Sequence, residues 1–202
     1  MPMPTPHTVE FWFEFGSNYS YLSAMRIEDA ARAAGAPLAW RPFLLGPVFR
    51  ELGWEGPPFV VQREKGEYAW RDTARRAQKY GLPFQRPSVF PRRALLPMRV
   101  ALLAAGEPWI GEFCRRMMHM AWAEDREIDA AAPVLSALDG LAPGPQALLA
   151  QACGEEAKAA LRDQTDEARR RGIFGGPSFI VAGELFWGDD RLEDALAWAQ
   201  GA

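Results

Sequence analysis

The apolar and polar positions near the start of the chain predict a β-α-β unit. Residues 9–15 read Val-Glu-Phe-Trp-Phe-Glu-Phe, which is the period-two alternation of a strand. Residues 19–34 have the pattern of a helix, and Gly35 ends it. A second strand is expected over residues 38–43, parallel to the first if the crossover has its usual right hand.

The middle of the chain, residues 44–175, has helical patterns divided by proline and glycine, as at 56–58 and 143–145. We see no convincing strand there, and the block therefore predicts an all-helical insertion. The clearest helices are expected over residues 94–105, 108–123, 131–138, 145–153 and 155–171.

Strand patterns return near the C-terminus. Residues 178–182 and 184–187 flank a turn at Gly183, as in a hairpin, and Asp190 with Glu193 forms a capping-box-like start to a last helix. This order predicts the α/β class, with a thioredoxin-like fold that holds a large all-helical insertion. The thioredoxin-like domain would comprise residues 1–43 and 176–202, and the insertion domain residues 44–175.

Composition excludes several classes of partner. The 202 residues are 49% hydrophobic and 24% charged, and the net charge is −3, so no strong field favours nucleic acid or an anionic membrane. No stretch reaches the ~18 apolar residues of a membrane span, and the N-terminus lacks the features of a signal peptide. We expect a cytoplasmic protein.

Cysteine and histidine positions argue against metal and disulfide chemistry. Cys114 and Cys153 lie in helical patterns far from any CxxC spacing, so we expect two buried, reduced thiols. His119 stands between two methionines and is expected to be an interior or interface histidine rather than a general base. No cluster of ligand residues suggests a metal site.

The first candidate site is Ser17-Asn18-Tyr19-Ser20, which places two hydroxyls where a redox protein would carry two cysteines. A helix N-terminus offers free N–H groups and about half a positive charge, which stabilise thiolates. Ser17 cannot form a disulfide, but its hydroxyl can donate to the thiolate of an external thiol. Alternatively, Ser17 or Ser20 is only an N-cap, worth about 1 kcal/mol.

Three stretches carry a resemblance to a known family: FEFGSNYSYL; FLLGPVFRELGW with the later YAWRD; and GIFGGPSFIVAGELFWGDDRLEDAL. Together they make the chain resemble 2-hydroxychromene-2-carboxylate isomerases, which are glutathione-dependent and related to kappa-class glutathione transferases and DsbA-like oxidoreductases. The resemblance covers nearly the whole chain. Asn18 stands where the family usually has proline, and Glu55 where asparagine is common.

The resemblance implies a glutathione site with a catalytic Ser17 facing the sulfur. It implies that Pro177 follows a cis peptide bond and that Gly176 offers its backbone to the cysteinyl part. It also implies that Asp189 and Asp190 accept from the ammonium of the γ-glutamyl end, with Asp190 the stronger match. Helix capping is the alternative role of Asp190.

The resemblance also implies a substrate, a small aromatic 2-oxo acid. Arg50 would pair with its carboxylate and Trp54 would cover its ring, unless Arg50 is simply solvated and Trp54 a core residue. The implied protein is a homodimeric isomerase that interconverts 2-hydroxychromene-2-carboxylate and trans-o-hydroxybenzylidenepyruvate. The alternatives are a kappa-class-like glutathione transferase or peroxidase, and a non-catalytic thiol- or peptide-binding module.

Overall fold

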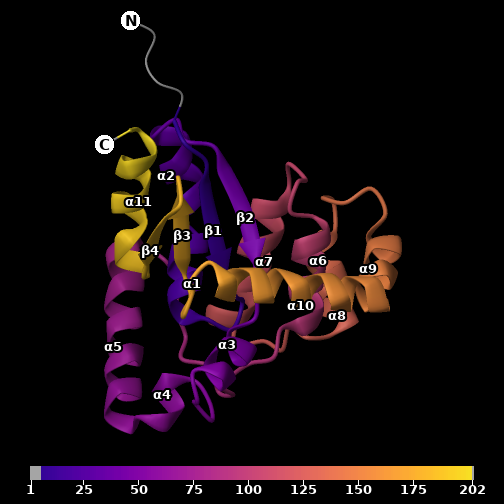
Figure 1. Cartoon of the computed structure of the whole chain (residues 1–202). Helices are drawn as coiled ribbons and strands as arrows, with labels where there is room; N and C mark the ends of the chain where they lie inside the picture. The colour runs from indigo at the N-terminus through magenta and orange to yellow at the C-terminus, as the bar shows by residue number, and fades with distance from the viewer. Residues whose placement is uncertain (1–5, 202) are drawn as a thin grey trace, which may run out of the picture.

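A four-stranded mixed sheet forms the centre of the protein, for which a computed structural model describes residues 6–201. The strands are β1 (Val9–Phe13), β2 (Leu38–Pro42), β3 (Ser178–Val181) and β4 (Glu184–Trp187), in the order β2-β1-β3-β4 (Figure 1). β1 runs parallel to β2 and antiparallel to β3, and β3 and β4 form a hairpin. The predicted parallel pair and hairpin are therefore confirmed.

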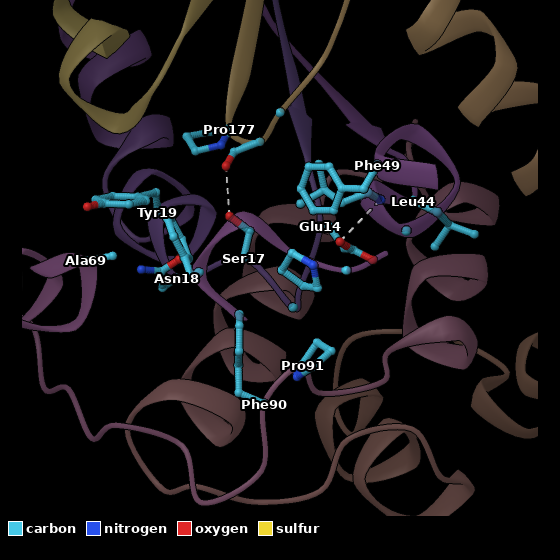
Figure 2. Close-up of a pocket in the computed structure, with 18 of the residues that line it drawn as sticks. Glu14, Ser17, Asn18, Tyr19, Leu44, Phe49, Ala69, Phe90, Pro91 and Pro177 are labelled. Carbon is cyan, nitrogen blue, oxygen red and sulfur yellow. Dashed lines mark hydrogen bonds between the residues drawn. The ribbon is translucent and has the colours of Figure 1, made fainter. Parts of the chain in front are cut away.

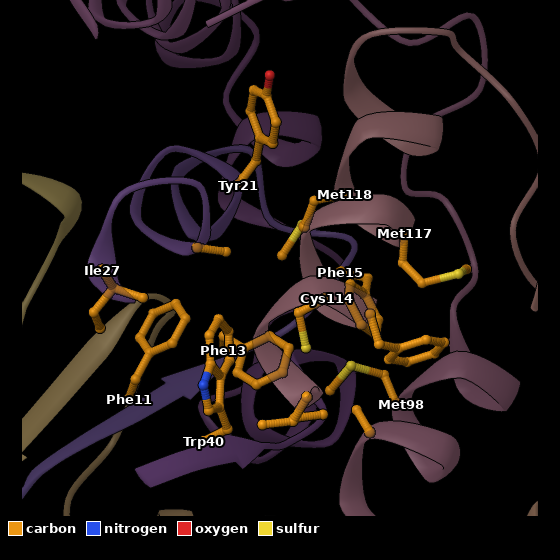
Figure 3. Packing of buried hydrophobic residues seen from close by; sticks show 14 of the residues in the cluster. Phe11, Phe13, Phe15, Tyr21, Ile27, Trp40, Met98, Cys114, Met117 and Met118 are labelled. Atoms are coloured by element: carbon orange, nitrogen blue, oxygen red, sulfur yellow. The ribbon is translucent and has the colours of Figure 1, made fainter. Parts of the chain in front are cut away.

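Alternation along β1 divides the core between the two faces of the sheet. Phe11 and Phe13 stack on one face with ring centroids 5.2 Å apart, in a large cluster that includes Trp40, Met98 and Cys114 (Figure 3). On the other face Trp12 packs into a second, smaller cluster. The other members of that cluster are Phe43, Leu45, Val48, Ala168, Ile173 and Ile180.

Two short helices, α1 (Asn18–Ala24) and α2 (Ile27–Ala33), occupy the region where one helix over residues 19–34 was predicted. The prediction of a single helix is wrong because the chain turns at Arg26. The guanidinium of Arg26 lies 3.0 Å from Asp189 and 2.8 Å from Glu193. These ion pairs tie the break to a segment far along the chain.

The helical block lies between β2 and β3, and residues 43–177 contain no strand. Helices α6 to α9 gather on the β2 side of the sheet (Figure 1). The five predicted helices of this block end within two residues of the observed ones. They are α6 (Leu95–Leu103), α7 (Ile110–Trp122), α8 (Ala131–Leu138), α9 (Pro145–Cys153) and α10 (Glu155–Arg170).

Three further helices precede these: α3 (Leu45–Glu51), α4 (Pro58–Val61) and α5 (Arg63–Tyr80). The prediction missed α5, the longest helix, because only a narrow stripe of it is buried and most of its residues are charged or polar. The division into residues 1–43 with 176–202 and residues 44–175 stays a prediction. Residues 1–5 and Ala202 of the predicted thioredoxin-like domain lie outside the residues that the structure describes.

The start of α11 (Leu192–Ala199) differs from the prediction. A 3-10 turn over Asp189–Arg191 precedes the helix. Arg191 is the N-cap residue of α11 and makes no side-chain capping hydrogen bond. Asp190 accepts a hydrogen bond from Arg191 and Glu193 accepts one from Arg26. The predicted capping box is therefore wrong, because both of its carboxylates are bound to arginines.

Candidate active site

Ser17 links the N-terminus of α1 to the segment before β3. Its Oγ accepts a hydrogen bond from the Ser20 N–H at 3.1 Å. The same hydroxyl donates one to the Gly176 carbonyl at 2.9 Å, drawn as the dashed line below Pro177 in Figure 2. Ser17 is thus the N-cap of α1, while Ser20 lies inside the helix. The Ser20 Oγ is buried and has no hydrogen-bond partner among residues 6–201, so Ser20 caps nothing.

The Gly176–Pro177 peptide bond is cis and directly precedes β3. A Cβ atom at Gly176 would lie 3.3 Å from the Ser20 Oγ and 3.6 Å from the Phe43 ring. This close approach leaves the Gly176 backbone next to the helix terminus, where the Ser17 hydroxyl reaches its carbonyl oxygen.

The position after Ser17 joins α1 to α5. Asn18 is buried, and its Nδ2 donates to the Thr73 Oγ1 at 2.6 Å. The neighbouring Tyr19 hydroxyl donates to Asp72 at 2.9 Å. Burial, then the hydrogen bond to Asp72, raises the pKa of Tyr19, which is therefore a hydrogen-bond donor at neutral pH.

Asp189 is the centre of a buried polar network. Its carboxylate accepts from the hydroxyls of Ser23 at 2.9 Å and Tyr80 at 3.1 Å, and it forms ion pairs with Arg26 at 3.0 Å and Arg76 at 3.6 Å. Burial lowers the pKa of Arg26, but Asp189 and Glu193 outweigh it and the net pKa is raised. These contacts of Asp189 hold α1, α5 and the 3-10 turn together.

Asp190 differs from its neighbour in being accessible. Its side chain is 47% exposed; its Oδ2 accepts from Arg191 at 3.3 Å and lies 4.0 Å from Arg76. Of the two aspartates, only Asp190 presents an open carboxylate.

One cavity of about 910 Å³ brings all the predicted site residues together. The Arg50 side chain reaches it from α3 and forms no ion pair within the described range 6–201. Trp54 is 41% exposed, with its ring 5.4 Å from that of Phe49, so the alternative of a core residue is wrong. The predicted residues in the cavity wall are Ser17, Arg50, Trp54, Gly176, Pro177, Asp189 and Asp190.

Other residues of the wall were not predicted. Glu14, Arg76, Phe90 and Pro91 line the same cavity (Figure 2 labels Glu14, Phe90 and Pro91). The signal for Glu14 was present in the alternation of the first strand, whereas Arg76 was missed together with α5. Burial raises the pKa of Glu14 to about 7, although the Leu45 N–H opposes this shift.

His119 and the two cysteines lie outside the cavity wall. His119 is partly exposed, with its Nε2 3.3 Å from Glu124, so the interior position was wrong. Cys114 is buried, and burial raises its pKa, but Cys153 is exposed at the last position of α9, next to the buried Ala152. The expectation of two buried thiols is therefore wrong for Cys153.

Within residues 6–201, two features are absent. No group of three or more His, Cys, Asp or Glu side chains is arranged to hold a metal ion. None of the helices combines the length and the apolar character that crossing a membrane requires.

The sheet order, the cis proline and the helix N-terminus beside it, capped by Ser17, define a thioredoxin-like fold. The model of the DSBA-like thioredoxin domain matches residues 8–197. The chain therefore belongs to this family, and the predicted fold class is confirmed.

Proteins similar to this chain include isomerases and glutathione transferases. A 2-hydroxychromene-2-carboxylate isomerase of Sphingobium xenophagum is 27% identical over 187 residues, covering 92% of this chain and 94% of the relative. Glutathione S-transferase kappa 2 of Caenorhabditis elegans is 26% identical over 204 residues, covering 94% and 90%. A solved 2-hydroxychromene-2-carboxylate isomerase superposes with a TM-score of 0.81 at 26% identity, covering 96% and 94%.

Proposed function

We propose that this protein is a glutathione-dependent isomerase that interconverts 2-hydroxychromene-2-carboxylate and trans-o-hydroxybenzylidenepyruvate. The observation that carries the proposal is the Ser17 hydroxyl at the N-terminus of α1, 2.9 Å from the carbonyl oxygen of Gly176. The similarity to isomerases along nearly the whole chain supports it. A homodimer and a cytoplasmic location are proposed on the same resemblance.

Three features of the cavity support a site for glutathione. The α1 N-terminus and the Ser17 hydroxyl suit a thiolate, and the backbone of Gly176 before the cis proline suits the cysteinyl amide. The exposed carboxylate of Asp190 suits an ammonium group. Because the Ser17 hydroxyl already donates to the Gly176 carbonyl, it would turn to the sulfur as a ligand N–H takes over that carbonyl.

Bound glutathione would supply a nucleophilic thiolate that adds reversibly to the conjugated double bond and so permits rotation about it. The protein's own residues orient the two partners. Ser17 donates a hydrogen bond at the sulfur, and Arg50 pairs with the substrate carboxylate. Trp54 and Phe49, whose rings are 5.4 Å apart, cover the aromatic ring.

Two measurements, one on the wild type and one on Ser17→Ala, test this proposal. In the wild type, glutathione at millimolar concentration should raise the melting temperature, because a ligand that binds the folded state stabilises it. Ser17→Ala should lose isomerase turnover while unfolding only about 1 kcal/mol more easily, the value of an N-cap. Unchanged turnover would remove Ser17 from the mechanism. No thermal shift in the wild type would favour a non-catalytic module.

A second candidate is a kappa-class-like glutathione transferase or peroxidase. Two kappa-class transferases match at 26% and 27% identity, similar to the isomerases. Such an enzyme would use the same thiolate site but pass the sulfur to an electrophile or a peroxide. Conjugation of an aryl halide faster than isomerisation of the 2-oxo acid would favour the transferase.

A further inference from the structure

Glu14 lies at the edge of the cavity, one residue beyond β1. The alternation of the strand places it on the same face as Glu10 and Trp12, opposite Phe11 and Phe13. A Cβ atom on Gly16 would be 4.0 Å from the Glu14 Oε2, so the carboxylate lies beside the turn that leads into Ser17 (Figure 2).

Glu10 and Glu14 share a strand face but differ in their partners. The Glu10 Oε2 forms ion pairs with Arg171 at 2.5 Å and Arg41 at 3.6 Å. Glu14 accepts a hydrogen bond from the Leu45 N–H at 3.3 Å, and no cation of residues 6–201 forms an ion pair with it. A partly buried carboxyl group that has no cation beside it favours its neutral form.

Both protonation states of Glu14 are accessible near neutral pH. Burial raises its pKa to about 7, and only the Leu45 N–H acts in the opposite direction. No histidine within the described chain lines the cavity. The charged groups that share it are Arg50 on α3, Arg76 on α5, Arg92 and Arg93 before α6, and Asp189 and Asp190 after β4, with Glu55, Lys65 and Asp72 at the α3–α5 side.

Glu14 and Arg50 each approach the first turn of α3. The Glu14 carboxylate binds the N–H of Leu45, the first residue of the helix. The Arg50 Nη1 lies 3.8 Å from the Cβ position of Gly46, the next residue. A 2-oxo acid carries its carboxylate and its carbonyl on adjacent carbons. A substrate whose carboxylate pairs with Arg50 can therefore turn its 2-oxo oxygen toward Glu14.

We propose that Glu14 is a further catalytic residue that gives a proton to the 2-oxo oxygen of the substrate and takes it back; this rests on the proposed function. As the alkene electron pair shifts toward the carbonyl, the O–H bond of Glu14 breaks and an O–H bond forms on that oxygen. The return step reverses both changes and restores the carbonyl. No proton or electron is consumed over the cycle, as an isomerisation requires.

A purely structural role is also open to Glu14, because its Oε2 supplies the acceptor for the first N–H of α3. The variant Glu14→Gln separates the two roles. The glutamine carbonyl can still accept from the Leu45 N–H, but the amide cannot carry the proton. The matched control is Glu10→Gln on the same strand face, because Glu10 lies outside the cavity wall.

Three measurements on Glu14→Gln, Glu10→Gln and the wild type test the proposal. Infrared difference spectra across the neutral range should show a carboxylic acid that ionises near pH 7 in the wild type and Glu10→Gln, and is lost in Glu14→Gln. Turnover should fall about a hundredfold or more in Glu14→Gln, and the inflection near pH 7 should disappear. The Kd for glutathione should be unchanged.

The contrary results distinguish failure of the role of Glu14 from failure of the proposed function. Full turnover and an intact pH inflection in Glu14→Gln, with an active wild type, would overturn the role of Glu14 and leave the proposed function standing. A Glu14 carboxyl that ionises at an ordinary acidic pH would also overturn it. A wild type that binds glutathione but does not isomerise the substrate would overturn the proposed function and, with it, the assigned step.

Discussion

Asn18 Nδ2 lies 2.6 Å from Thr73 Oγ1, and this hydrogen bond joins the first turn of α1 to the middle of α5. Both residues are buried. The contact accounts for the asparagine at a position where the resemblance leads one to expect proline, because proline offers no side-chain donor. It also fixes α5, one wall of the cavity, to the helix that carries Ser17.

Asn18→Ala should lower the free energy of unfolding by about 1–3 kcal/mol, because the buried Thr73 hydroxyl loses its donor. Urea denaturation of Asn18→Ala, Thr73→Val and the double variant measures the coupling between the two positions. We expect a coupling of about 0.5–3 kcal/mol. Additive effects would show that the hydrogen bond contributes nothing.

Asp189→Asn should be strongly destabilising, by about 3–5 kcal/mol, because it removes the charge that neutralises the arginines in a buried network. The Asp189 side chain is 0% exposed. The matched control is Asp194→Asn, whose side chain is 55% exposed and paired with Arg191; it should cost less than about 1 kcal/mol. Equal losses in the two variants would contradict a structural role for Asp189.

Asp190→Asn should weaken glutathione binding while leaving the fold intact. A charge-assisted hydrogen bond contributes about 1.5–3 kcal/mol, so the Kd should rise roughly ten- to a hundredfold. Calorimetric titration measures it, with the melting temperature as the check on folding. An unchanged Kd would show that the γ-glutamyl ammonium is held elsewhere.

The contribution of Glu14 to the free energy of unfolding should fall as the pH rises from about 4.5 to above 7. Its pKa is raised from 4.5 to about 7, so between these values the folded protein holds a proton that the unfolded chain has lost. The stability of Glu14→Gln relative to the wild type should therefore increase with pH, by up to roughly 3 kcal/mol above pH 7. A difference between the two proteins that does not change with pH would contradict this.

The sheet could be predicted from the sequence because its signals are local. The alternation of residues 9–15 and the turn at Gly183 specify β1 and the β3–β4 hairpin without reference to the rest of the chain. The break between α1 and α2 could not be predicted. It depends on ion pairs of Arg26 with Asp189 and Glu193, which are close only in the folded molecule.

Some residues of the candidate site could likewise be predicted from local sequence, and others only from the fold. Ser17 and Pro177 stand out in the sequence because each lies at the junction of two elements. Glu10 and Glu14 look alike in the strand pattern, and only the fold shows that Glu10 has two arginine partners whereas Glu14 faces the cavity. Arg76 lies on a helix too polar for its periodicity to be recognised.

The proposed function requires that a thiol held at Ser17 drives the isomerisation. The most direct measurement is the initial rate of conversion of 2-hydroxychromene-2-carboxylate by the wild type with glutathione, with S-methylglutathione, and with neither. We expect rapid conversion with glutathione alone, because S-methylglutathione fills the same site but has no free thiol. An equal rate with S-methylglutathione or without any added thiol would rule out the proposed function.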